Sequence, residues 1–326
     1  MQLLPRRRSL SLAVMAAVAF ASAACTTADG SGPTLEVDAS FAAEMASSAH
    51  YVGAPQRVQV GILATDSQGQ HVVTGGSVDL TFAYQGEDGG DSGPGPIATA
   101  SYVAVPGTEP AGDGPGITTS ARGIYQAEDV VFDRPGIWGV TVSVEIDGVT
   151  RELPATVEVF EDSPIPAPGD RAPRTETLTM DSDVRPGAID SMADGSGDVP
   201  DPELHRITIA DAIRQGRPAL VLFGTPAYCT SRMCGPEVQE LQRLASEYPD
   251  LGEYIHVEIW KDYDGQVINR GAADWLLWKR PDGTPELTEP WLYLIGADGV
   301  IVDRWGSLFD TEEVASALQA LPSMSS

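Results

Sequence analysis

The hydrophobic pattern of the chain changes once along its length, and this change constrains the fold more than any other feature. Across residues 57–160 apolar and polar residues alternate, as at Val78, Leu80, Phe82 and Tyr84, and Gly, Pro and Asp separate the runs. A period of two is typical of strands with one buried face. Six such runs predict an antiparallel β-sandwich. They cover residues 58–64, 78–84, 100–105, 124–132, 137–146 and 149–159.

Residues 161–204 are rich in Pro, Asp, Ser and Gly, a composition that predicts an extended linker. From residue 205 onward the pattern is that of helices alternating with strands. The uninterrupted apolar run 219–223 is typical of a buried parallel strand, and residues 237–248 gather their apolar side chains on one helical face. The order of strands and helices predicts a mixed sheet flanked by helices over 205–326.

Two of the three cysteines, Cys229 and Cys234, follow the first apolar strand of this second half and precede its long helix. Residues five apart in a regular helix lie about 8.6 Å apart at Cα, whereas a disulfide needs about 4.4–6.8 Å. A bridge therefore requires either Cys229 in the loop before the helix or an unwound first turn. Pro236 favours the loop, because proline is tolerated in a first helical turn.

Element order, cysteine position and the Glu289-Pro290-Trp291 sequence together resemble thioredoxin over residues 206–321. The run from Thr225 to Pro236 is similar to extracytoplasmic thioredoxin-like proteins. The resemblance implies an α/β thioredoxin-like C-terminal domain in which Pro290 is cis beside the disulfide. It also implies that the carbonyl of Glu289 pairs with substrate backbone and that Trp291 lies near the bridge.

The same resemblance makes Cys229 the attacking thiolate and Cys234 the resolving cysteine, although Cys234-Gly235-Pro236-Glu237 offers an alternative register. Tyr228 would shield Cys229, contact substrate or simply pack. Residues 123–138 resemble the strand–turn–strand ending of bacterial extracytoplasmic Ig-like modules. The expected fold class is therefore an all-β Ig-like sandwich followed by the thioredoxin-like domain.

Three functions are open for the cysteine pair. The expected one is a cell-envelope thiol–disulfide oxidoreductase without a cofactor, whose partners are exported protein thiols or disulfides and an envelope redox partner. The second is a binding or scaffold lipoprotein with a structural disulfide. The third is a peroxidase, because one peroxiredoxin branch (the bacterioferritin-comigratory type) also spaces its cysteines by four. Glu258 on the next strand could assist proton transfer.

A metal site is not expected from the sequence. The chain has four histidines, His50, His71, His205 and His256, and no closely spaced His or Cys/His cluster. Nucleic-acid binding is excluded by charge, because 20 Lys and Arg stand against 47 Asp and Glu, a net charge of −27 that repels phosphate backbones.

The N-terminus predicts export. Three arginines at 6–8 precede a short apolar stretch at 10–24 that is too short to span a bilayer. Its end resembles a bacterial lipobox, which implies lipidation of Cys25, although Ser22 departs from the usual residue. We expect an anchor at the outer face of the cell membrane, with a secreted or periplasmic form as the alternative. The expected parts are a signal peptide at 1–24, a tail at 25–56, the sandwich at 57–160, the linker at 161–204 and the last domain at 205–326.

Overall fold

The computed structural model describes residues 39–86, 93–109, 111–118, 122–195, 197–229, 233–280 and 282–321. The predicted signal segment and Cys25 lie outside these residues. The described residues, from 39 to 321, all belong to one compact unit. Among the helices described, none has the length and apolar character needed to cross a bilayer.

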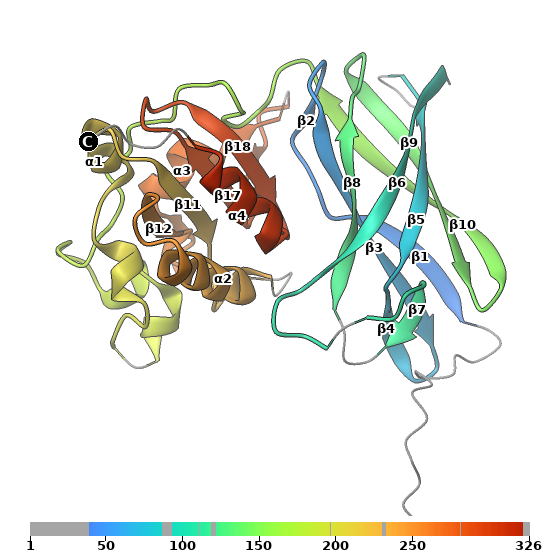
Figure 1. The fold of residues 1–326 in the computed structure, drawn as a ribbon, viewed down its shortest axis with the longest axis horizontal. Helices are drawn as coiled ribbons and strands as arrows, with labels where there is room; N and C mark the ends of the chain where they lie inside the picture. The colour runs from blue at the N-terminus through green and yellow to red at the C-terminus, as the bar shows by residue number, and fades with distance from the viewer. Residues whose placement is uncertain are drawn as a thin grey trace, which may run out of the picture. The chain divides into compact units, whose positions relative to one another are not determined.

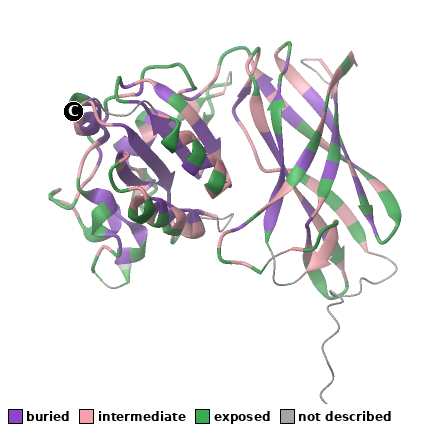
Figure 2. Cartoon of the chain, in the orientation of Figure 1, coloured by how far each residue is buried: buried purple, intermediate pink, exposed green. Residues whose placement is uncertain are grey.

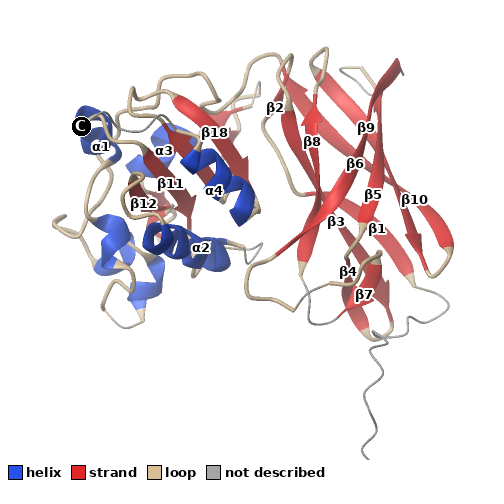
Figure 3. Cartoon of the chain, viewed as in Figure 1, coloured by secondary structure: helices blue, strands red, loops and turns tan. Residues whose placement is uncertain are grey.

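The first half of the chain forms one sheet of ten strands in the order β2-β10-β9-β5-β6-β8-β3-β4-β7, with β1 also paired to β3 (Figure 1, Figure 3). All pairs are antiparallel except β2 with β10. The strands are β1 (Ser40–Met45), β2 (His50–Tyr51), β3 (Gln56–Asp66), β4 (Gly69–Thr74), β5 (Ser77–Tyr84), β6 (Gly93–Ala104), β7 (Gly116–Thr118), β8 (Gly123–Val130), β9 (Gly136–Ile146) and β10 (Val149–Phe160).

Alternation in the sequence becomes alternation of burial in this sheet. In β5, Val78, Leu80 and Phe82 are buried and the residues between them are exposed. Phe132 lies at the centre of the core, with its ring centroid 5.5 Å from that of Phe82 and 5.3 Å from that of Trp138. Edge-to-face contacts of this kind stabilise a core beyond the area that they bury.

The predicted Ig-like sandwich is wrong, because strand pairing runs without a break through the whole sheet. β5 pairs with β6 on one side and with β9 on the other, and β6 pairs with β8. A sandwich consists instead of two separately hydrogen-bonded sheets that meet through side chains. The structure therefore has one large curled sheet.

The second half contains a four-stranded sheet in the order β12-β11-β17-β18. β11 pairs in parallel with β12 and antiparallel with β17, which pairs antiparallel with β18. β11 and β17 are buried along their whole length, as apolar runs require (Figure 2). The strands are β11 (Ala219–Gly224), β12 (Glu253–Glu258), β17 (Trp291–Ile295) and β18 (Ile301–Gly306).

Helices supply apolar residues to two core clusters around this sheet. α1 and α3 contribute to one cluster, and α2 and α4 to the other. The helices are α1 (Ile209–Arg214), α2 (Cys234–Glu247), α3 (Arg270–Leu276) and α4 (Thr311–Gln319). Two short strand pairs, β13 (Trp260–Asp262) with β14 (Val267–Ile268) and β15 (Trp278–Lys279) with β16 (Pro285–Glu286), complete this half.

The predicted fold class is also wrong for the chain as a whole. Strand accounts for 43% and helix for 17%, so the chain is β-rich and the ten-stranded sheet dominates it. The prediction of an α/β thioredoxin-like domain behind an Ig-like sandwich depended strongly on the positions of the cysteines and the proline. Those positions describe a local motif and leave the strand pairing of the larger half undetermined.

Residues 161–204 differ from an extended linker, because they pack. Ile165 and Ala172 join the core of the second half, and three 3₁₀ helices follow, η1 (Pro186–Ala188), η2 (Ser191–Asp194) and η3 (Pro202–His205). Polar residues are buried here as well, among them Asp190 and Asp201. Buried polar groups require partners, and both carboxylates face the histidine rings of His205 and His256.

Candidate metal centre

Four buried side chains converge beside the four-stranded sheet. Asp190 precedes η2, Asp201 precedes η3, His205 ends η3, and His256 lies in β12. One oxygen of Asp190 accepts a hydrogen bond from the backbone N–H of Met192 at 2.7 Å, which caps η2 and fixes the carboxylate. Each of the four residues has a relative exposure of 1%.

The free atoms of these side chains face one another at close range. Asp190 Oδ2 lies 3.2 Å from His256 Nδ1 and 4.0 Å from His205 Nε2. The Asp201 carboxylate lies 3.4 Å from His205 Nε2 and 3.7 Å from His256 Nδ1. One ligand atom from each residue fits within a set whose members are all within 4.8 Å of one another.

Despite this proximity, the atoms do not satisfy one another. Asp190 Oδ2, both carboxylate oxygens of Asp201, both ring nitrogens of His205 and His256 Nδ1 find no hydrogen-bond partner of good geometry among the described residues. Unpaired polar atoms at this depth are costly. These nitrogen and oxygen atoms face one another at close range without hydrogen bonds of good geometry, which is the arrangement expected of ligands to a common ion.

The spacing suits a tetrahedral ion. Zinc binds imidazole nitrogen and carboxylate oxygen at about 2.0–2.2 Å, so neighbouring ligands of a tetrahedral site lie roughly 3.3–3.5 Å apart. Three of the four contacts just described fall within a few tenths of an ångström of that range. The longest, between Asp190 and His205, requires a small inward movement of one side chain.

The outer ring nitrogen of His256 also has the contact expected of a metal ligand. His256 Nε2 lies 3.3 Å from the carbonyl oxygen of Gly224 at the end of β11. A histidine that binds metal through one ring nitrogen usually donates its other N–H to a carbonyl or a carboxylate. Here a proton on Nε2 would be donated to Gly224 and would leave Nδ1, the atom that faces the aspartates, as the ligand.

Without a metal, a proton can take the ion's place. Burial opposes the charged imidazolium, but Asp190 and Asp201 outweigh it and raise the pKa of His256 to about 9. Burial also acts against the Asp190 carboxylate, yet the neighbouring His256 lowers the pKa of Asp190. Burial lowers the pKa of His205. The two aspartates thus create a pocket of negative charge that requires a cation.

The ligand set points to a particular class of ion. Two imidazoles and two carboxylates match zinc and its first-row neighbours. Magnesium and calcium prefer six or more oxygen ligands. Two carboxylates neutralise a divalent ion, and four protein ligands with no exposure leave no open coordination position, which is the pattern of structural rather than catalytic zinc.

The cysteines singled out in the sequence lie close to this cluster. Cys229 and Cys234 form a disulfide with a Cα–Cα distance of 6.1 Å. Cys234 begins α2, and Cys229 lies in the turn before it, with its N–H donated to the carbonyl of Thr225 at 2.9 Å. Cys229 therefore lies outside α2. The bridge does not have to span two residues that lie five apart in one regular helix.

Tyr228, Pro236 and Glu289 are among the residues that were expected to lie around the bridge. The Tyr228 ring stacks on Tyr263 with centroids 3.9 Å apart, and Pro236 occupies the first turn of α2. The Glu289–Pro290 peptide bond is cis, and an oxygen of Glu289 lies within 4.8 Å of both sulfurs. Burial and the charge of Glu258 raise the pKa of Glu289 to about 8.

Trp291 and Glu258, two further residues considered from the sequence, make hydrogen bonds within the fold. Trp291 is buried and donates its ring N–H to Thr288 Oγ1 at 3.0 Å. Both oxygens of Glu258 accept backbone N–H groups, from Ser191 at 2.9 Å and from Trp260 at 3.0 Å. Glu258 thus holds two backbone segments, those at Ser191 and at Trp260.

The sequence reasoning missed the metal cluster. Its one local signal is the Asp201–His205 pair, whose spacing of four places both side chains on one face of a helical turn. Asp190 lies in what looked like an extended linker, and His256 lies in an apolar strand. The search for closely spaced His and Cys residues could not find ligands contributed by three separate segments.

No family model matches the chain, and no curated protein matches it. A solved structure that it matches is described as a family 123 glycoside hydrolase from Clostridium perfringens involved in glycolipid glycan hydrolysis. The identity is 11%, the TM-score is 0.24, and the match covers 66% of this chain and 36% of that protein, so the chain spans about a third of its length. A likeness this low says nothing about the activity of this chain.

The chain is β-rich, and its largest element is a single ten-stranded sheet. The predicted membership of an extracytoplasmic thioredoxin-like family with an Ig-like module is therefore wrong. The predicted thiol–disulfide oxidoreductase activity is corrected with it, because that activity depended on the resemblance. The peroxidase and the thioredoxin-fold scaffold shared the same basis and are corrected too. The disulfide itself remains as an observed feature of the chain.

Proposed function

We propose that this chain is a metal-binding protein that holds one divalent ion of the zinc class between Asp190, Asp201, His205 and His256. The convergence of four buried ligand side chains, whose facing atoms make no hydrogen bond of good geometry among the described residues, supports the proposal most strongly. The absence of exposure at every ligand makes the ion structural, with no coordination position left for a substrate.

The ion would add a direct link to the contacts that already hold these segments together, among them the hydrogen bond from the Ser191 N–H to Glu258. Asp190, Asp201 and His205 belong to the irregular stretch before α1, whereas His256 belongs to β12. Metal affinity at such a site contributes directly to folding, because the ligands are not assembled in the unfolded chain. The proposed role is to hold residues 190–205 against the sheet.

The proposal is tested on the chain without its N-terminal segment 1–25. We expect elemental analysis to find one zinc per chain, and calorimetric titration of chelator-treated protein to show a single tight site. Cobalt in place of zinc should give the intense visible absorption of a tetrahedral ion. Zinc affinity should fall at least about 100-fold in Asp201→Asn and in His256→Gln.

His71→Gln is the matched control, because His71 lies in the ten-stranded sheet with its ring 3.1 Å from Asp66 and outside the cluster. It should bind zinc as the unmodified chain does. If the protein takes up no zinc, cobalt or other first-row ion at neutral pH, the four residues form a buried ion-pair network and the proposed function is wrong.

We further propose that the chain is exported and anchored by lipid at Cys25. The arginines at 6–8, the short apolar stretch and the cysteine after it support this location, and a disulfide suits an oxidising compartment. Labelled palmitate should enter the full chain and not Cys25→Ser, which should also leave the membrane fraction. Palmitate labelling that persists in Cys25→Ser would exclude this anchor. Exported thiol or disulfide proteins as partners remain a prediction.

A further inference from the structure

We propose that the metal centre and the Cys229–Cys234 disulfide are energetically coupled, so that a bound zinc ion protects the disulfide from reduction. This inference rests on the proposed function and adds a form of regulation to it. Two chains of buried contacts join the ligands to the cysteines, and each passes through only one or two residues.

The first chain of contacts begins beside the ligand Asp190. The next residue, Ser191, is buried, and its Oγ accepts the backbone N–H of Ala227 at 3.1 Å and lies 3.5 Å from Thr225 Oγ1. The carbonyl of Thr225 in turn accepts the N–H of Cys229 at 2.9 Å. The position of Asp190 therefore influences the turn that carries the first cysteine.

The second chain of contacts begins at the ligand His256. Its Nε2 lies 3.3 Å from the carbonyl oxygen of Gly224. A Cβ at Gly224 would lie 3.4 Å from the Cβ of Cys234 and 3.6 Å from its sulfur, so the backbone of this glycine packs directly against the second cysteine. A shift of His256 is therefore transmitted to Cys234 by contact.

A bound ion would fix both ends of this arrangement at once. It would fix Asp190 and His256, and through them the turn 224–229 and the start of α2. The disulfide would then have less freedom to open. Coupling of this kind is reciprocal at equilibrium, so an ion that stabilises the bridged chain must bind less tightly once the bridge is lost.

The first measurement is reduction by tris(2-carboxyethyl)phosphine. The phosphine attacks one sulfur, the S–S bond breaks, and water then supplies the oxygen of the phosphine oxide while two protons complete the two thiols. The disulfide gains two electrons and the phosphine loses them. We expect reduction of Cys229–Cys234 to be about tenfold slower with saturating zinc than without metal, within the usual range of coupling.

The second measurement is zinc affinity without the bridge. In the chain without segment 1–25, which lacks Cys25, Cys229→Ser/Cys234→Ser removes the disulfide and leaves no free thiol that could bind zinc itself. Its affinity for zinc should be about tenfold weaker than that of the disulfide form, because the ion stabilises the bridged chain. Because both measurements use the folded chain with all four ligands, neither depends on a variant of the metal site.

Ser191→Ala tests the first chain of contacts. The variant loses the hydroxyl that Ala227 and Thr225 contact, keeps every metal ligand, and should lower the ratio of the two reduction rates by at least about threefold. Ser182→Ala is the control, because its hydroxyl accepts the N–H of Thr179 in the same segment, and it should leave the ratio unchanged.

The outcomes separate the two proposals. Zinc that binds tightly while the reduction rates and the affinity of the double variant stay unchanged overturns the coupling and leaves the metal site intact. A chain that binds no zinc overturns both.

Discussion

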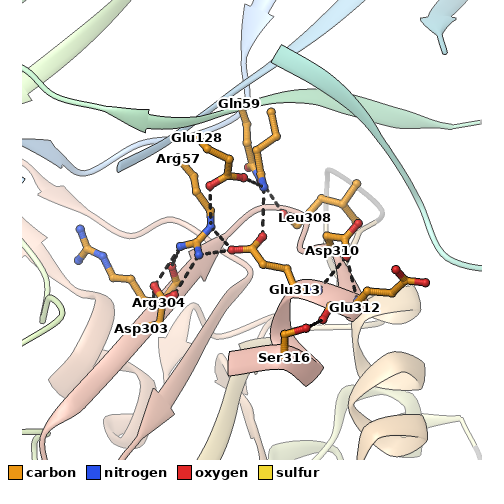
Figure 4. Close-up of polar contacts among 11 residues, drawn as sticks. Arg57, Gln59, Glu128, Asp303, Arg304, Leu308, Asp310, Glu312, Glu313 and Ser316 are labelled. Carbon is orange, nitrogen blue, oxygen red and sulfur yellow. Dashed lines mark hydrogen bonds and ion pairs between the residues drawn. The ribbon is translucent and has the colours of Figure 1, made fainter. Parts of the chain in front are cut away.

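Arg57 binds both carboxylate oxygens of Asp303, with Nη1–Oδ1 and Nη2–Oδ2 distances of 3.0 and 2.9 Å (Figure 4). Arg57 lies in β3 of the ten-stranded sheet and Asp303 in β18 of the four-stranded sheet. The same guanidinium donates through Nε to Glu313 of α4 at 2.7 Å and lies 4.9 Å from the ring centroid of Trp305. One cation thus contacts both halves of the chain.

Arg57→Ala should destabilise the protein by about 2 kcal/mol, between the cost of losing an exposed ion pair and that of losing a buried one. The side chains of Arg57 and Asp303 are 21% and 27% exposed, which places the pair between these limits. Removal of the arginine also leaves Asp303 and Glu313 near each other without the cation between them. Urea unfolding followed by Trp fluorescence measures the difference.

Arg270→Ala is the matched control, because the Arg270 side chain is 93% exposed and lies 3.9 Å from Asp274. Its removal should change the unfolding free energy by less than about 0.5 kcal/mol. Equal effects in the two variants would show that the Arg57 contacts contribute no more than a surface pair.

His50 should make the protein less stable in acid. Burial, followed by the charge of Arg304, lowers the pKa of His50 to about 4. The folded state keeps this imidazole neutral, whereas the unfolded state takes up a proton below its ordinary pKa of about 6.5. The contribution of His50 to the unfolding free energy is therefore fully present above pH 6.5. It falls between pH 6.5 and pH 4, by about 3 kcal/mol in total.

His50→Gln retains a polar group near Ser47, whose hydroxyl lies 3.0 Å from the imidazole. The difference in unfolding free energy between the variant and the unmodified chain should change over pH 6.5–4 and stay flat over pH 7–8. A difference that is independent of pH across the whole range would contradict the shifted pKa.

Glu237 should make the protein less stable as the pH rises. It is fully buried in the first turn of α2, and this burial raises the pKa of Glu237 well above its ordinary value. The folded state holds the proton more tightly than the unfolded state, so the contribution to stability is complete below pH 4.5 and is lost as the pH rises.

Glu237→Gln carries no charge and should therefore stabilise the protein at pH 8 by at least about 1 kcal/mol, roughly the equivalent of one pKa unit. At pH 5 the gain should be smaller. Glu312→Gln in the first turn of α4, where the side chain is exposed, serves as the control and should change the unfolding free energy by less than about 0.5 kcal/mol. Thermal unfolding at the two pH values gives the comparison.

Hydrophobic alternation located individual strands but left their pairing open. The run 78–84 corresponds closely to β5, because alternation records which side chains are buried. It carries no information about partners, and β5 pairs with both β6 and β9. That double pairing changes two expected sheets into one. A helix cap is a more local feature than strand pairing, as at Asp310, which accepts the N–H groups of Glu312 and Glu313 two and three residues further on.

The metal ligands were harder to find because each one looks ordinary in its own segment. Composition made residues 161–204 look solvated, but composition averages over residues and cannot show that Asp190 and Asp201 are buried. Their burial depends on His205 and His256 being opposite them, which is a tertiary property. The cysteine pair was easier to locate from the sequence, because the Cα–Cα distance that a disulfide allows already favoured one cysteine in a loop and the other at the start of a helix.

Removal of the metal should loosen the segment that supplies three of the four ligands. Arg206 is exposed and follows the ligand His205 directly, so trypsin can reach its peptide bond when residues 190–205 detach from β12. We expect cleavage after Arg206 to become at least about tenfold faster in chelator-treated protein and to return to the original rate when zinc is added back. Cleavage after Arg122, an exposed residue that precedes β8 in the other half, should be unaffected by either treatment. Mass spectrometry of the fragments separates the two sites, and equal acceleration at both would indicate global unfolding in place of a local release of the metal-bound segment.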